Sequence, residues 1–120
     1  MEHGPVGYWR LGENSNNNAA ADSSGNGIDG SYIGSVDVGE TSAVANDSDT
    51  AANFDGSDER VLIAPNSDLA NIETGTIQMW IKADDLGGNQ TFFSADQTGQ
   101  GEDGHITMYM DGSTLKVRYQ

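Results

Sequence analysis

Residues 105–119 read His-Ile-Thr-Met-Tyr-Met-Asp-Gly-Ser-Thr-Leu-Lys-Val-Arg-Tyr, and this stretch indicates the fold class. Two runs of apolar, aromatic and β-branched residues flank Asp111-Gly112-Ser113, and an Asp-Gly pair in that position is typical of a tight β-hairpin turn. In the second run, apolar side chains alternate with Lys116 and Arg118. Because successive side chains of a strand point to opposite faces, the alternation predicts an antiparallel sheet with one apolar and one polar face.

The same two-residue period predicts strands elsewhere in the chain. The most regular run is Thr76–Lys82, in which Ile77, Met79 and Ile81 fall on one face and polar or aromatic residues fall on the other. Shorter strands are expected at Val6–Leu11, Ser31–Val36, Ala51–Phe54, Arg60–Ala64 and Thr91–Ala95.

Long helices are not expected, because no segment carries apolar residues at the helical spacing i, i+3, i+4 and i+7. A single helical turn is expected at Ser67–Ile72, with Ser67 or Asp68 as its cap. Asn14–Gly30 is expected to be a loop and Asp37–Thr50 to be irregular, because both are rich in small and polar residues.

Roughly eight short strands at this spacing predict an all-β, antiparallel β-sandwich of the jelly-roll kind. Residues 1–120 are expected to form one such domain or its N-terminal portion. Trp9 is expected in the core, packed with Leu11 and the region of Phe54.

The composition excludes several classes of function. Of the 120 residues, 19 are acidic and 5 are basic, which gives a formal net charge of −14. This field repels phosphate backbones, so nucleic-acid binding is not expected. No apolar run is long enough for membrane insertion, and no basic patch fits an anionic membrane surface. There are no cysteines, so disulfides, thiolate metal sites and cysteine nucleophiles are excluded.

Five motifs in a fixed order resemble the laminin-G-like, concanavalin A-like lectin/glucanase domains of secreted proteins: Tyr8–Glu13, Ala21–Gly27, Ala52–Asp58, Val61–Ile63 and Thr76–Lys82. The resemblance implies a jelly roll in an extracellular or cell-surface protein. Members of this family usually continue through further strands, so the chain is expected to be incomplete at its C-terminal end. The missing strands would then come from another copy or another chain, by self-association or strand pairing.

The resemblance also implies calcium as a structural cofactor. Ca²⁺ takes six to eight oxygen ligands, and Asp22, Asp55 and Asp58 are loop acids of the kind that supply them. The alternative is that Asp22 and Asp55 close Asx turns through their own backbone, which is common for Asp before Gly or Ser. The sequence leaves both interpretations open.

A glycan site is expected on the polar-side face of Thr76–Lys82. Sugars are recognised by aromatic rings against their C–H surfaces and by planar polar groups at their hydroxyls. Trp80 and Gln78 share that face, and Tyr109 is the third residue proposed for the site. The alternative is that Trp80 is a packing residue covered by loops.

Catalysis is not expected. No strand carries the alternating acids that glucanases use, and no Gly-x-Ser-x-Gly nucleophile motif is present. The sequence therefore predicts a non-catalytic extracellular module that binds a carbohydrate or protein ligand in adhesion or substrate targeting. Two alternatives stay open: a structural component of a surface layer, fibre or virion, and an accessory fragment of a polysaccharide-degrading enzyme.

Overall fold

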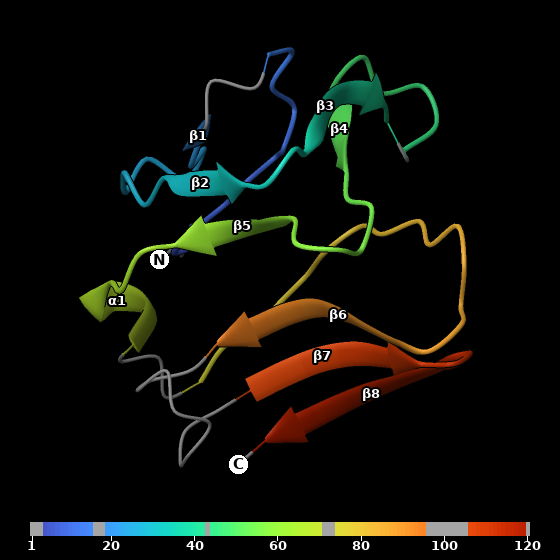
Figure 1. Cartoon of the computed structure of the whole chain (residues 1–120). Helices are drawn as coiled ribbons and strands as arrows, with labels where there is room; N and C mark the ends of the chain where they lie inside the picture. The colour runs from blue at the N-terminus through green and yellow to red at the C-terminus, as the bar shows by residue number, and fades with distance from the viewer. Residues whose placement is uncertain (1–3, 16–18, 43, 71–73, 96–105, 120) are drawn as a thin grey trace. The chain divides into compact units, whose positions relative to one another are not determined.

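The structure, a computed structural model, describes residues 4–15, 19–42, 44–70, 74–95 and 106–119. These residues form eight β-strands and one helical turn, and every strand pair is antiparallel (Figure 1). The all-β class and the antiparallel pairing are therefore confirmed. The chain divides into two units, residues 1–81 and residues 82–120, each of which is described by itself.

The N-terminal unit contains two small sheets and one helical turn. The first sheet has the order β1-β2-β5, with β1 at Ala19–Ala20, β2 at Gly30–Ile33 and β5 at Arg60–Ile63. The second sheet pairs β3 at Asp37–Thr41 with β4 at Thr50–Asn53. The helical turn α1 spans Ser67–Ala70, with Asp68 in its first turn.

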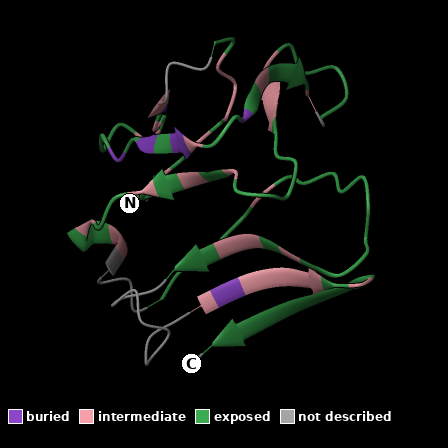
Figure 2. Cartoon of the chain, in the orientation of Figure 1, coloured by how far each residue is buried: buried purple, intermediate pink, exposed green. Residues whose placement is uncertain are grey.

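The core of this unit is small and centres on β2. Buried Ala20, Tyr32 and Val36 form its cluster (Figure 2). Five partly buried hydrophobic residues pack against it: Trp9, Leu11, Val38, Ala52 and Val61. Trp9 and Leu11 are thus placed in the core as expected, whereas Phe54 is 39% exposed and lies outside the cluster. Gly30 has no room for a side chain, because an added Cβ would lie 2.6 Å from the side chain of Val61.

The C-terminal unit is a three-stranded meander. Its strands β6 (Asn89–Ala95), β7 (Ile106–Asp111) and β8 (Thr114–Tyr119) pair in the order β6-β7-β8. The hairpin expected from Asp111-Gly112-Ser113 is confirmed, and Asp111 pairs with Thr114 across a two-residue loop. Gly112 takes a φ of 57° at the first loop position, which suits a type II′ turn and favours glycine.

The most regular strand expected from the sequence is not found, and this expectation is wrong. Thr76–Lys82 forms no strand, and Ile77, Trp80 and Ile81 are 41%, 76% and 51% exposed. The alternation of apolar and polar residues shows only that this segment would have an apolar face if it formed a strand. A strand forms when a neighbour satisfies its backbone hydrogen bonds, and no described residue pairs with this segment.

Three further expectations need correction. The strand expected at Val6–Leu11 is reduced to one isolated bridge between Trp9 and Asp22. The loop expected at Asn14–Gly30 contains β1, and the irregular segment Asp37–Thr50 begins with β3. Pairing with β2 and β4 orders these stretches although their own composition favours turns.

The remaining expected elements are found within three residues of their expected bounds. They are the strands at Ser31–Val36, Ala51–Phe54, Arg60–Ala64 and Thr91–Ala95 and the helical turn after Asn66. Ile72 and His105, at the ends of two expected elements, lie outside the described residues. No described helix is long and apolar enough to cross a membrane. The jelly-roll arrangement stays a prediction.

Candidate functional site

Asp22 is the centre of a dense hydrogen-bond network in the N-terminal unit. Its Oδ1 accepts the backbone N–H of Tyr8 at 2.9 Å and that of Ser24 at 2.8 Å. Its Oδ2 accepts the Ser24 hydroxyl at 2.7 Å and the backbone N–H of Ile28 at 2.9 Å. These four donors hold the pKa of the Asp22 carboxyl well below its ordinary value, with the Tyr8 N–H making the largest contribution.

The hydrogen bonds of this network also hold the loop Ala21–Gly27 against the N-terminal segment. Ser24 and Asn26 extend the network to the N-terminal segment, since the Asn26 side-chain amide donates to the Val6 carbonyl at 2.9 Å. Gly25 and Gly27 have φ values of 92° and 72°, a left-handed backbone that favours glycine. Asp22 therefore fastens the Pro5–Trp9 segment to this loop.

Glu13 is a second structural carboxylate, and the sequence analysis did not single it out. Its Oε1 accepts the backbone N–H of Ala21 at 2.9 Å, and its Oε2 accepts the Tyr32 hydroxyl at 2.6 Å. Burial raises the pKa of Tyr32 above its ordinary value, and the Glu13 carboxylate raises it further. Glu13 could be identified only from the pairing of β1 with β2, which the sequence did not predict.

The proposed calcium ligands do not form a cluster. Among the described residues, no three His, Cys, Asp or Glu side chains lie close enough to hold a metal ion together. Asp55 Oδ1 accepts the backbone N–H of Ser57 at 2.8 Å, which is an Asx turn, and the Asp58 carbonyl accepts from Arg60 at 3.2 Å. Asp22 already accepts four hydrogen bonds from protein donors, and the calcium site stays a prediction.

The proposed sugar-binding residues are divided between the two units. Gln78 and Trp80 are exposed residues of the N-terminal unit in a segment that forms no strand, and neither lines the two hollows described below. Tyr109 lies on β7, the central strand of the C-terminal unit, and is half-buried. Of the two hollows described below, Tyr109 lines the one in the C-terminal unit.

That pocket is an open hollow of about 170 Å³ lined by residues of all three strands of the meander: Asn89, Thr91, Thr107, Tyr109 and Arg118. Strand register explains the grouping. Thr91 pairs with Tyr109, and Thr107 pairs with Arg118, so these side chains share one face of the sheet. We call this face, with the five residues listed above, the polar face.

Arg118 contributes a positive charge to the polar face. Within the described part of the chain, its guanidinium makes no ion pair or hydrogen bond, whereas Lys116 on the same face pairs with Asp111 at 2.5 Å. The Asp111 carboxylate raises the pKa of Lys116. A free guanidinium beside a tyrosine ring and threonine hydroxyls can bind a planar anion and the hydroxyls next to it.

Sequence reasoning did not assign Arg118 to the site, although the signal was present. A two-residue loop between Asp111 and Thr114 fixes the register of the hairpin, and this register places Arg118 opposite Thr107 and beside Tyr109.

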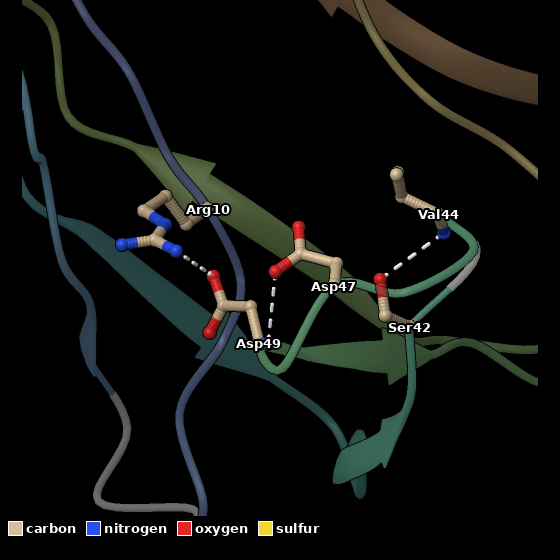
Figure 3. A network of polar contacts seen from close by, with 5 residues as sticks. All are labelled: Arg10, Ser42, Val44, Asp47 and Asp49. Atoms are coloured by element: carbon tan, nitrogen blue, oxygen red, sulfur yellow. Dashed lines mark hydrogen bonds and ion pairs between the residues drawn. The ribbon is translucent and has the colours of Figure 1, made fainter.

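A second hollow, of about 170 Å³, lies in the N-terminal unit and is lined by charged residues that already have partners. Arg10 Nη2 lies 2.6 Å from Asp49 Oδ2, and Asp47 Oδ1 accepts the Asp49 N–H (Figure 3). Glu13 uses both carboxylate oxygens in the contacts described above. This hollow therefore offers a ligand fewer free groups than the polar face does.

Comparison of the chain with family models, with curated proteins and with solved structures gave no match.

Proposed function

We propose that the chain is a non-catalytic extracellular module of the laminin-G-like kind, which binds a carbohydrate or protein ligand in adhesion or substrate targeting. We place its carbohydrate site on the polar face of the β6-β7-β8 sheet. The observation that carries this placement is the guanidinium of Arg118, which has no partner among the described residues and lies in the same hollow as Tyr109.

The chemistry of the polar face favours an acidic sugar over a neutral one. The Tyr109 ring offers an apolar surface for sugar C–H groups, and the hydroxyls of Thr91 and Thr107 lie on the same face. Arg118 can bind a carboxylate through two parallel N–H···O bonds. Because the chain has a net charge of −14, one free cation on a shallow site makes the expected binding weak and sensitive to salt.

This proposal predicts that Arg118→Gln selectively weakens binding of an acidic sugar. Titration calorimetry with tri-galacturonate is expected to show about tenfold weaker binding for the variant, because one charge-assisted contact is worth roughly 1.5 kcal/mol or more. Arg60→Gln is the matched control, because Arg60 is an exposed arginine on β5 of the other unit. Equal affinity of wild type and Arg118→Gln, or equal binding of neutral tri-galactose, would contradict the assignment.

The assembly alternative is favoured by a different observation, the exposed apolar side of the same sheet. Leu115, Val117 and Tyr119 on β8 are 58%, 60% and 79% exposed. A surface component whose strands pair with neighbours would use such residues. Light scattering separates the two functions: a defined oligomer that binds no sugar supports assembly, and a sugar-binding monomer supports the module.

A further inference from the structure

Strand β8 is unusual because all six of its residues are exposed although half of them are large and apolar. Register places Leu115, Val117 and Tyr119 opposite Met110, Met108 and Ile106 of β7, on the face away from Arg118. Figure 2 shows β8 as exposed along its whole length, beside the intermediate burial of most of β7. An exposed row of this kind is typical of a surface that a partner covers.

The backbone of β8 has a free edge as well. The described sheet ends at β8, because its order is β6-β7-β8. In a two-residue hairpin the residues that flank the loop exchange both backbone bonds, and bonded and non-bonded pairs then alternate. Since Asp111 pairs with Thr114, the N–H and C=O groups of Leu115, Val117 and Tyr119 face outward, away from β7. A further strand could add at this edge.

A second copy of β8 is a poor candidate for that strand. Two of the five basic residues of the chain, Lys116 and Arg118, alternate along β8. If two β8 strands pair antiparallel with their apolar residues on one face, the two registers with the longest overlap place Lys116 opposite Lys116 or Arg118 of the other copy. Like charges directly opposite each other destabilise a sheet. The same charges attract a strand that carries acids at those positions.

We propose that β8 binds an extended acidic segment, which adds to the sheet as a fourth strand. Apolar residues of this segment cover Leu115, Val117 and Tyr119, and its alternating acids lie opposite Lys116 and Arg118. Charge complementarity favours this partner. On β8 cations alternate with apolar residues, and on the proposed segment acids alternate with apolar residues at the matching positions. This inference goes beyond the carbohydrate site, with which it shares only Arg118.

A labelled peptide tests the proposal. Fluorescence anisotropy is measured with fluorescein-Thr-Ile-Asp-Val-Glu-Val-Thr and with a matched peptide in which both acids are replaced by lysine. The acidic peptide is expected to bind about tenfold tighter, because two cross-strand charge pairs change from attractive to repulsive. Arg118→Glu is expected to remove this preference.

A backbone variant tests the strand geometry. In Val117→Pro the outward N–H is lost while the bonds to β7 remain, since proline is tolerated at the solvent side of an edge strand. Peptide binding is expected to fall at least about tenfold, with the circular dichroism spectrum unchanged. If this variant does not fold, Arg118→Glu alone decides.

Equal binding of the acidic and lysine peptides, or no binding of either peptide at millimolar concentration, would overturn the proposal. It would also be overturned if sedimentation shows a dimer of the wild type that is lost in Val117→Pro. The last result would assign the edge to a second copy. Val117 does not line the polar face, so tri-galacturonate binding by Val117→Pro reports on the carbohydrate site separately.

Discussion

Replacement of Asp22 by alanine is expected to lower the thermal midpoint of the N-terminal unit by roughly 10 °C, one of the largest effects expected for a substitution outside the core cluster. The variant leaves three backbone or hydroxyl donors without their acceptor and releases the N–H of Tyr8 from the Ala21–Gly27 loop. The measurement is thermal unfolding followed by circular dichroism. Asp37→Ala is the matched control, because Asp37 is exposed and the structure shows no side-chain contact for it.

The same variant has a defined pH dependence. The pKa of Asp22 is lowered in the folded state, so its stabilising contribution is present above the ordinary carboxyl value of about 3.9 and is lost as the pH falls below it. The midpoints of wild type and Asp22→Ala are therefore expected to differ fully at pH 7 and to converge towards pH 2. A constant difference across this range would show that the carboxylate charge does not act through the network.

Calcium provides a second readout for Asp22. All four hydrogen bonds that this carboxylate accepts come from protein donors. The decrease in thermal midpoint caused by Asp22→Ala is therefore expected to be equal in 5 mM CaCl₂ and in EDTA at about the same ionic strength. A difference in thermal midpoint that occurs only with calcium would make Asp22 a metal ligand and would support the calcium interpretation drawn from the family resemblance.

The two tryptophans are expected to differ strongly. Trp9 packs on the core, and its Nε1–H donates to the carbonyl of buried Ile28 at 2.8 Å. Trp9→Ala is expected to cost about 3 kcal/mol of unfolding free energy, at the low end for a tryptophan because Trp9 is only partly buried. Trp9→Phe keeps most of the packing but leaves the Ile28 carbonyl unpaired, and a cost of about 1–2 kcal/mol is expected.

Trp80 provides the internal control for this pair of variants. Its side chain is 76% exposed, so Trp80→Ala is expected to change the unfolding free energy by less than about 0.5 kcal/mol. Urea unfolding, followed by circular dichroism, measures all three variants. A large loss for Trp80→Ala together with a small one for Trp9→Ala would contradict the core described above.

Features whose interacting residues are close together in the sequence could be predicted from it. The hairpin at Asp111–Thr114 could be predicted because its two strands and its turn are adjacent in sequence, so one short segment contains the whole interaction. Asp22 was identified as a notable acid, but its role depends on Tyr8 and Ile28, which are brought together by the loop. The Asx-turn interpretation of Asp55 came directly from the residues that follow it.

Other features depend on distant partners and could not be predicted locally. Thr76–Lys82 has a regular alternation but no described strand beside it, whereas the Gly-containing β3 is ordered by its pairing with β4. A bulge between Thr91 and Phe93 shifts the register of β6, which brings Thr91 opposite Tyr109. The polar face therefore depends on a register that no single segment specifies.

Chemical-shift mapping tests the proposed site most directly. In ¹H–¹⁵N spectra of the full chain titrated with tri-galacturonate, the account predicts that the shifted backbone signals cluster at Thr91, Thr107, Tyr109 and Arg118. Shifts centred on the indole N–H of Trp80 and the amide of Gln78, with the signals of β7 unchanged, would contradict it.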